Sequence, residues 1–538
     1  MTKNRTTLNI LGTALLALTV ATVSAIANAQ VPPPLSYPMW LQLRNNPDAL
    51  RQLQLPQPPA TPRPAVASVA SQWQQLINNV PISYSNPLLM TDGTVIVHNE
   101  SAQDWWKLTP DINGSYVNGT WSQIASLPAG YGPLYFGSAV LPDGRVIING
   151  GEYNFGGFAW TNKGAIYSPQ INMWRPVSPP AGWTNIGDAS TVVLSDGTYM
   201  LADALTTQQA LLSISTSGGI SSMIWAVIGA GKVDSNNEEG WTLLPSGNVL
   251  TVDTYVGQGT CGRNSEIYGV QTGVWASAGD TPNQLADCNN SDEMGPQVLR
   301  PDGTVVAFGA TTSGVAHTAI FDSHTTSWTA GPDLPTINGQ NYTLADAPAA
   351  LLPSGHVLFA ASPGLFGPPV HFFELDMEGG ISQAADTPDA PNITSYYVNF
   401  LVLPTGQILA TDFISIEIYT PSGAPDPNWA PVIATCPGTV VRGTTYQLTG
   451  SQFNGLSQGA AYGDDVQGAT NFPIVQLVNS STGHVFYART SGFNTMSVAP
   501  NTPSSTNFVA LGNTETGLSQ LSVIANGIAS QPVDVVVQ

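Results

Sequence analysis

Apolar residues in this chain occur in short paired runs, with a two-residue turn between the two runs of each pair. In VLPDGRVIINGGEY, residues 140–153, two apolar segments flank Asp143 and Gly144. The phrase recurs at intervals of about 50 residues. The turn pairs are Asp92-Gly93, Asp143-Gly144, Asp196-Gly197, Ser246-Gly247, Asp302-Gly303, Ser354-Gly355 and Thr405-Gly406. Because glycine tolerates the positive φ of a tight hairpin, each copy predicts two buried antiparallel strands.

The repeat length predicts the architecture. A hairpin at this period, followed by a tryptophan, is typical of kelch repeats, each of which forms one four-stranded blade. Tryptophans follow the turns at Trp121, Trp174, Trp225, Trp275 and Trp328, and they predict outer strands that pack against the neighbouring blade. Trp73 precedes the first hairpin and predicts the outermost strand of the last blade, which would close the ring without a free edge. We therefore expect an all-β fold with a seven-bladed β-propeller over residues 67–428.

The two ends of the chain differ from the repeat. The hairpin period stops near Trp429, and residues 429–538 predict a C-terminal immunoglobulin-like β-sandwich. Residues 30–66 are rich in proline and predict a segment that wraps the surface. Residues 1–29 have a basic start, an apolar run and small residues up to Ala29, the pattern of a signal peptide cleaved there. We expect export to a periplasm, a cell surface or the medium, and no membrane span.

The net charge limits the kinds of partner that the protein is expected to bind, and the cysteines predict one disulfide. Loss of Lys3 and Arg5 with the signal would change the formal net charge from −21 to −23, which disfavours nucleic acid as a partner. Hydrophobic residues make up 42% of the chain and charged residues 9%, as in a folded, loop-rich β protein. In an oxidising compartment, Cys261 and Cys288 are predicted to form a disulfide. Cys436 is predicted to be a buried free thiol, with an intermolecular disulfide as the alternative.

Candidate chemistry lies at a fixed offset in the repeat. Inner strands begin at one rim of the propeller channel, so residues nine positions before each turn glycine should form a ring there. They are Tyr84, Tyr135, Asp188, Glu238, Met294, Asp346 and Tyr397, with Glu293 beside Met294 and Tyr396 beside Tyr397. Tyrosines stack on flat ligand faces, and carboxylates hold hydroxyls or a cation. The ring predicts a site for a carbohydrate or small polar ligand. The alternative is a solvated rim whose carboxylates accept hydrogen bonds from nearby backbone amides.

The layout resembles the galactose oxidase and glyoxal oxidase superfamily of copper radical oxidases. The resemblance rests on the signal, the kelch propeller and the end domain, particularly the segment GLSQGAAYGDDVQGATNFPIVQLVNSSTGHVFYART, residues 455–490. It covers essentially everything after residue 70. It implies a secreted protein and, at the rim, the positions of a copper site.

The residues at those positions do not match the copper ligands that the resemblance implies. Tyr84 stands where the family has the cysteine of its cross-linked pair, and Tyr135 stands at the tyrosine of that pair. Tyr396 and Tyr397 stand where the family has its axial tyrosine and adjacent histidine. A second family histidine comes from an end-domain loop, which we place around Phe493, where this chain has no histidine. We therefore expect a member that lacks the copper ligands.

The sequence leaves several functions open. Copper needs imidazole nitrogens, and the six histidines show no clustering at the rim, so no metal ligand is predicted. Our first interpretation is a non-copper binding protein. The alternatives are an oxidase of primary alcohols, aldehydes or sugars with a rearranged copper site, and a non-catalytic envelope or adhesive protein. A carboxylate pair could also serve acid and base catalysis. Asp464 and Asp465 suggest calcium, although two acids in a glycine-rich loop more often form a turn.

Overall fold

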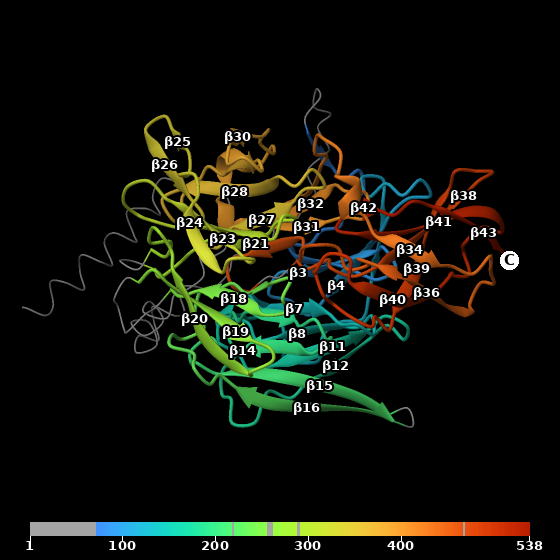
Figure 1. Ribbon diagram of the computed structural model, residues 1–538, viewed down its shortest axis with the longest axis horizontal. Coiled ribbons are helices and arrows are strands. Elements are labelled where there is room, and N and C mark those ends of the chain that lie inside the picture. The colour runs from blue at the N-terminus through green and yellow to red at the C-terminus, as the bar shows by residue number, and fades with distance from the viewer. Residues whose placement is uncertain (1–71, 218–219, 255–261, 288–290, 466–467) are drawn as a thin grey trace, which may run out of the picture.

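The computed structural model describes residues 72–217, 220–254, 262–287, 291–465 and 468–538 (Figure 1). These residues form β-strands and three short 3₁₀ helices, η1 (Ala390–Asn392), η2 (Ser395–Tyr397) and η3 (Pro427–Trp429). No helix in the described ranges is long and apolar enough to span a membrane. The chain is all-β, as the sequence predicts. The predicted signal peptide, the proline-rich segment and the Cys261–Cys288 pair lie outside the described residues, whereas Cys436 is a half-buried free thiol.

Each hairpin of the repeat opens an antiparallel sheet whose strands follow one another in sequence. The first three sheets contain β2 (Tyr84–Leu89), β3 (Val95–Asn99), β4 (Trp105–Thr109) and β5 (Thr120–Gln123); β7 (Gly137–Val140), β8 (Val146–Asn149), β11 (Gly164–Ser168) and β12 (Met173–Pro176); and β13 (Thr191–Val193), β14 (Tyr199–Ala202), β15 (Gln209–Ser217) and β16 (Ile220–Ile228). A small sheet of β6 (Pro133–Leu134), β9 (Tyr153–Asn154) and β10 (Gly157–Phe158) lies beside the second.

The later repeats follow the same order. The fourth and fifth sheets contain β17 (Thr242–Leu243), β18 (Val249–Val252), β19 (Asn264–Gly269) and β20 (Val274–Asp280), and β21 (Gln297–Leu299), β22 (Thr304–Phe308), β23 (Thr318–Asp322) and β24 (Ser327–Ala330). The sixth repeat contributes β27 (Pro348–Leu351), β28 (Val357–Pro363), β29 (His371–Leu375) and β30 (Ile381–Gln383) to a larger sheet with β25 (Thr336–Ile337), β26 (Gln340–Thr343) and β37 (Ala460–Tyr462). The seventh contains β31 (Asn399–Val402), β32 (Ile408–Thr411) and β33 (Ile416–Tyr419).

The sheets are arranged around a common centre. Their first strands contact one another in the cyclic order β2, β7, β13, β17, β21, β27, β31 and again β2. The N-terminal strand β1 (Trp73–Gln75) pairs antiparallel with β33, so that Trp73 lies opposite Tyr419. The predicted closing strand is therefore where the sequence places it. Because the sixth repeat shares its sheet with strands from outside the repeat, the count of seven separate blades stays a prediction.

The turns and tryptophans behave as the repeat predicts. All seven turn glycines have a positive φ, between 72° and 88°. Indole N–H groups of three outer strands donate to the preceding sheet or to the loop that follows it, whereas the Trp174 indole N–H has no hydrogen-bond partner among the described residues. Trp275 donates to Gln209 Oε1 at 2.9 Å, Trp328 donates to Ser265 Oγ at 2.8 Å, and Trp225 donates to the Ser178 carbonyl at 2.8 Å. These residues join neighbouring sheets and are structural.

The C-terminal residues form a second β region, orange to red in Figure 1. Its strands are β34 (Val432–Thr435), β35 (Thr439–Val440), β36 (Thr445–Ser451), β38 (Ile474–Asn479), β39 (Val485–Ser491), β40 (Pro503–Val509), β41 (Gly517–Ala525), β42 (Ile528–Ala529) and β43 (Val533–Val537). They enclose their own apolar core, which includes Leu448, Val475 and Phe508. The domain boundary near residue 429 stays a prediction.

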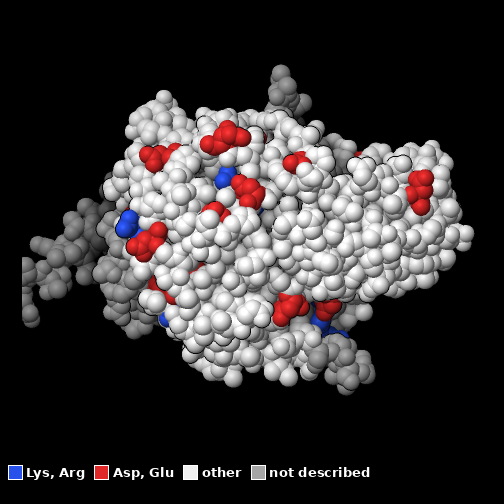
Figure 2. Space-filling view, viewed as in Figure 1, with Lys and Arg blue, Asp and Glu red and all other residues white. Residues whose placement is uncertain are grey.

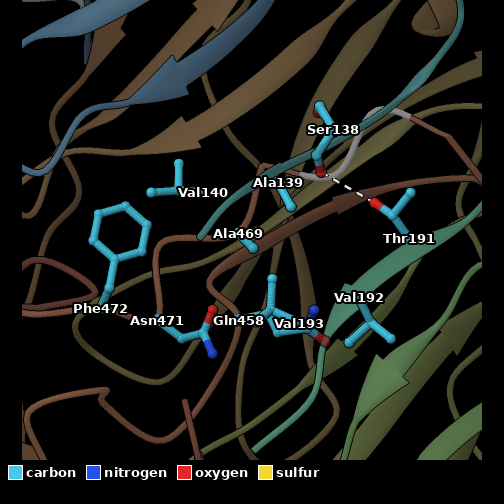
Figure 3. A pocket seen from close by; sticks show the side chains of 10 residues that line it. All are labelled: Ser138, Ala139, Val140, Thr191, Val192, Val193, Gln458, Ala469, Asn471 and Phe472. Atoms are coloured by element: carbon cyan, nitrogen blue, oxygen red, sulfur yellow. Dashed lines mark hydrogen bonds between the residues drawn. The ribbon is translucent and has the colours of Figure 1, made fainter. Parts of the chain in front are cut away.

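This end region packs on the turn side of the ring. Backbone N–H groups of Thr490, Gly492 and Met496 donate to carbonyls of Thr91, Pro142 and Ser195, which immediately precede hairpin turns, at 3.1, 2.7 and 2.9 Å, respectively. Nearby, residues of the segment 458–472 line a small cavity with β7 and β13, where Thr191 Oγ1 donates to the Ser138 carbonyl (Figure 3). The turns of the first three sheets therefore lie under the end region, opposite the rim where the inner strands begin.

One segment of the end region crosses the ring from the turns to the rim. At the turn end, Leu351 N donates to the Gly459 carbonyl at 2.7 Å. β37 then runs antiparallel to β27, and Tyr462 lies opposite Pro348 at the rim end of that strand. At the next residue, Gly463, an added Cβ would lie 2.4 Å from Asp346 Oδ1. The segment therefore delivers its acidic residues to the rim.

Candidate functional site

All the predicted rim residues except Tyr84, which begins β2, lie just before the innermost strands. Three of them have left-handed backbones: φ is 49° at Tyr135, 58° at Glu238 and 43° at Asp346. Such a conformation costs free energy in a non-glycine residue and persists only where the surroundings fix it. Next to Glu293, Asp292 also has a φ of 65°. In these repeats, the connecting loop therefore has a left-handed backbone conformation shortly before the inner strand begins.

Three carboxyl groups from successive sheets meet at the rim. One oxygen each from Glu238, Glu293 and Asp346 lies within 4.8 Å of the other two. The three residues are at most 2% exposed. Neither Glu293 oxygen accepts a hydrogen bond from an N–H or hydroxyl group of the described residues, and the side chain lies against the carboxyls of Asp346 and Glu238, with which it can share a proton. The structure therefore brings these three predicted residues together.

Two further carboxyls complete what we call the central carboxyl group: Asp188, Glu238, Glu293, Asp346 and Asp464. Asp188 precedes β13, is 1% exposed and interacts electrostatically with Asp346. Asp464 comes from the crossing segment, is 2% exposed and interacts with Asp188 and Glu238. Its backbone carbonyl accepts a hydrogen bond from Ser190 Oγ at 3.1 Å. The group therefore draws on four sheets of the ring and on the end region.

Burial dominates the electrostatics of this group. It raises the pKa of Asp188 to about 7, with the charge of Asp346 adding to the shift, and it raises the pKa of Asp346 to about 6. Burial and neighbouring carboxyls hold the pKa values of Glu238, Glu293 and Asp464 well above the usual range. Carboxyls in such a group either keep protons at neutral pH or require a counter-charge.

Tyrosines border the central carboxyl group on one side. The rings of Tyr396 and Tyr397, in η2, meet edge to face with centroids 4.9 Å apart. Tyr135 and Tyr153 form a second edge-to-face pair at 6.1 Å. Tyr462 Oη donates to the Tyr396 carbonyl at 2.9 Å, which ties the crossing segment to this side. Burial raises the pKa values of Tyr135, Tyr153, Tyr396 and Tyr462 well above 10, so these phenols are neutral.

Tyr84 lies apart from the other predicted rim residues. Its ring contacts Trp121, the outer-strand tryptophan of its own sheet, with centroids 6.1 Å apart. Its hydroxyl donates to the Val80 carbonyl at 2.6 Å. Burial raises the pKa of Tyr84 to about 12, and the charge of Asp412, which belongs to the seventh repeat, adds to the shift. Tyr84 therefore shares the offset of the rim residues but does not join the central group.

The end-domain residues at the centre are not the ones that the resemblance suggested. Phe493 stacks on Phe472 with parallel rings 6.2 Å apart, and its backbone N–H donates to the Pro142 carbonyl on the turn side. The segment that reaches the rim contains Tyr462 and Asp464 instead. Our placement of the loop around Phe493 was wrong, because turn contacts hold that part of the end region away from the rim.

A copper site of the galactose oxidase kind does not fit the described residues at the centre. His98 is buried, its Nε2 lies 2.8 Å from the Ala102 carbonyl, and burial lowers its pKa to about 4. Four other histidines have Nδ1 against a carboxylate: His317 against Asp333, His356 against Glu374, His371 against Asp386 and His484 against Glu515. His324 lies against the turn at Gly303. The central donors in this part of the chain are oxygens, whereas copper prefers imidazole and sulfur ligands.

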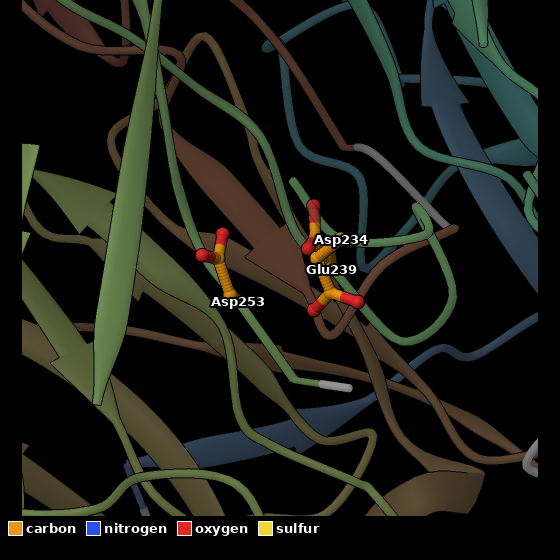
Figure 4. A group of neighbouring side chains, drawn as sticks. All are labelled: Asp234, Glu239 and Asp253. Carbon is orange, nitrogen blue, oxygen red and sulfur yellow. The ribbon is translucent and has the colours of Figure 1, made fainter. Parts of the chain in front are cut away.

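A second carboxyl group lies beside the first and has its own cation. In this lysine-centred group, Lys232 Nζ lies 2.9 Å from Glu239, 2.6 Å from Glu266 and 3.6 Å from Asp253. One oxygen each from Asp234, Glu239 and Asp253, the side chains drawn in Figure 4, lies within 4.8 Å of the other two. Burial lowers the pKa of Lys232, but the carboxylates outweigh it and the pKa is raised. The ammonium therefore stays charged and neutralises part of the group.

Sequence reasoning missed several residues of these two groups. Asp464 was noted as an acid in a glycine-rich loop, but no signal showed that this loop crosses the ring. Tyr462 and Tyr153 lie outside the repeat offset and gave no signal. Lys232 stands in GKVDSNNEEG, where only the rarity of lysine in this chain marks it. The offset count found residues at the strand starts and could not find those brought in by other segments.

Comparison with known proteins gives limited similarity. No protein-family model matches the chain. The chain is 30% identical over 86 residues to Kelch-like protein terF of Aspergillus terreus, and the match spans 16% of this chain and only 18% of that protein. A solved fungal alcohol oxidase of the AA5 family, in complex with copper, matches with a TM-score of 0.47 and 14% identity, over 87% of this chain and 98% of that one. The role of the central carboxyl group therefore rests on its own geometry.

Proposed function

We propose that the protein is a non-copper relative of the galactose oxidase-like superfamily that binds a small polar ligand, such as a carbohydrate unit, at the central carboxyl group. One observation carries the proposal. Carboxyls from separate segments, Asp188, Glu238, Glu293 and Asp346 among them, converge at the rim beside neutral tyrosines. Convergence of buried polar groups on one point is typical of a ligand site, because it opposes folding unless a ligand or proton compensates.

The chemistry of the site favours a ligand with several hydroxyls. An ionised carboxylate accepts two or more hydrogen bonds, and a phenol can donate one in return. Inside a protein such bonds are stronger than in water. Because Tyr135 and Tyr396 are only 3% and 5% exposed, the site would enclose a small ligand, and an open face on which a long glycan stacks is disfavoured.

The cellular setting and the family are part of the same proposal. Residues 1–29 have the composition of an export signal, so we propose that the protein acts outside the cytoplasm. The kelch-type turns, the closing strand and the crossing segment support a place in the galactose oxidase-like superfamily. Few charged side chains interrupt the face shown in Figure 2, and most of those that do are acidic, which does not favour binding of polyanions.

Thermal-shift titration with single monosaccharides tests this function. The purified chain is held in EDTA, so that metal ions do not contribute, and glucose, galactose, mannose and xylose are added in turn. We expect at least one sugar to raise the melting temperature. The double variant Tyr135→Phe with Asp346→Asn should lose this response, because it removes a hydroxyl and a charge while keeping both side-chain volumes.

A matched control uses another buried tyrosine. Tyr167 donates its hydroxyl to Asn172 Oδ1 at 3.0 Å, away from the rim. Tyr167→Phe should respond to the sugar as the unaltered chain does. A response that the double variant keeps would overturn the proposed site, and the absence of any response to these sugars would count against a carbohydrate ligand.

A further inference from the structure

The central carboxyl group has the geometry of a cation site. Glu238, Glu293 and Asp346 precede β17, β21 and β27, so they reach the same point from three neighbouring sheets. Their nearest oxygens are mutually within 4.8 Å, which allows one ion to touch all three. The residues are between 0% and 2% exposed, so bulk water screens their charges poorly.

Asp188 gives a second, independent indication of a cation site. Asp188 comes from a fourth sheet and is 1% exposed. Neither of its carboxylate oxygens has a hydrogen-bond partner on another described residue. The charge of Asp346 acts on Asp188, and the charge of Asp188 acts on Glu238, so Asp188 lies beside the three-residue cluster. A buried carboxylate that accepts no hydrogen bond from another residue is costly, and an ion between Asp188 and the three-residue cluster would supply the missing interaction.

The described chain supplies no counter-charge at this point. The nearest buried ammonium, that of Lys232, is within ion-pair distance of Glu239, Asp253 and Glu266. None of the ion pairs found in the described ranges includes Asp188, Glu238, Glu293 or Asp346. Several buried carboxylates without a base are unfavourable unless protons or a cation neutralise them.

We propose that Glu238, Glu293 and Asp346, with Asp188 facing them, bind a divalent cation of the calcium class. The donors are carboxylate oxygens from separate segments, which suits the variable, many-oxygen coordination of Ca²⁺ better than the strict octahedron of Mg²⁺. The inference rests on the proposed function in that it concerns the same site, and it names a ligand class which that proposal leaves open. With the ion bound, the carboxyls of the site are ionised.

Calorimetry on the chain freed of metal by EDTA and then desalted tests the proposal. We expect CaCl₂ to bind with one ion per chain at this site. Glu293→Gln should weaken this binding at least tenfold, because it removes the central charge and keeps the side-chain volume. The melting temperature of metal-free Glu293→Gln should equal or exceed that of the unaltered chain, which shows that the variant folds.

The lysine-centred group provides the matched control. Asp253→Asn also neutralises one buried acid, but it leaves Lys232 paired with Glu239 and Glu266. It should therefore keep calcium binding within about twofold. Absence of stoichiometric binding, or equal binding by the unaltered chain and by Glu293→Gln, would overturn the cation site. Because the monosaccharide titration is run in EDTA and this one without sugar, either proposal can fail while the other stands.

Discussion

Glu238 and Glu239 are neighbours in the chain but belong to two groups that neutralise charge differently. Glu239 contacts Lys232 at 2.9 Å, in a group that carries its own cation. Glu238 faces Glu293 and Asp346, and none of the ion pairs found among the described residues includes any of these three. The comparison shows that burial alone does not define a ligand site. Where the chain encodes the counter-charge, we interpret the carboxylates as structural, and where it does not, we propose that they are available to an external ion or ligand.

The largest expected effect comes from removing the built-in cation. Lys232→Met should lower the free energy of unfolding by about 3–5 kcal/mol, because it leaves buried carboxylates without their partner. Urea denaturation measures the change. Lys163→Met, at an exposed lysine, should change stability by less than about 1 kcal/mol. Equal effects of the two substitutions would mean that the lysine-centred group does not need its ammonium. Addition of CaCl₂ to Lys232→Met should recover part of the loss, since Asp234, Glu239 and Asp253 then form a second cluster without a base.

Glu417 is a further buried acid, and it should make the stability of the chain depend on pH. Glu417 has no hydrogen-bond partner on either carboxylate oxygen among the described residues, and burial, with the charges of Asp412 and Asp389, raises its pKa to about 9. A folded-state pKa above the unfolded value gives stability that is complete below about pH 4.5 and is lost as the pH rises towards 9. Between pH 6 and pH 8 the unaltered chain should therefore lose about 2–3 kcal/mol more stability than Glu417→Gln.

Melting curves at the two pH values measure this difference. Glu378→Gln, at an exposed glutamate, should keep the pH dependence of the unaltered chain. If Glu417→Gln shows the same slope as the unaltered chain, this carboxyl is already ionised in the folded state, and burial without a partner is tolerated here. That result would also weaken the contrast drawn between the two larger groups.

The next largest effect is expected from a substitution in the crossing segment. At Gly463 a methyl group would lie 2.4 Å from Asp346 Oδ1, so Gly463→Ala should displace the segment from the rim. We expect a loss of about 1–3 kcal/mol in stability from this overpacking, together with weaker calcium binding. At Gly438, also in the end region, an added Cβ would meet no atom within 4 Å, and Gly438→Ala should leave both properties unchanged. Equal calcium binding by the two variants would show that the segment does not shape the site.

The smallest effect concerns the tyrosine side of the site. Tyr462→Phe removes the hydrogen bond to the Tyr396 carbonyl and should cost about 1 kcal/mol in denaturant unfolding. Calcium binding should persist, because no carboxylate is altered. A loss of binding would show that the tyrosines help to define the cation site and are not only its border.

The sequence predicts those residues whose position depends on the repeat. Asp188, Glu238 and Asp346 lie at the offset itself and Glu293 one residue before it, because each inner strand starts a fixed distance before a glycine turn and the strand geometry brings the starts together. Asp464 could not be found in this way, since its position depends on how the end region packs on the ring.

The positions of the other residues in the two carboxyl groups depend on how the strands pair. Glu266 reaches Lys232 because β18 and β19 pair with Thr251 opposite Glu266, a register that the hydrophobic pattern alone does not fix. Tyr84 shows that a residue at the right offset does not always reach the centre. It has the right offset, but its hydroxyl bonds to Val80, four residues earlier, and this local contact turns the side chain away from the centre.

The pairing of β1 with β33 has a consequence for biosynthesis. The strand that completes the seventh sheet is made first, whereas its partner around Tyr419 is made after almost the whole ring. Trp73 therefore stays unpaired and solvent-accessible until that partner leaves the ribosome. During this interval the nascent ring is an open arc with unsatisfied backbone groups at both ends, and a chaperone that covers them would raise the yield of folded protein.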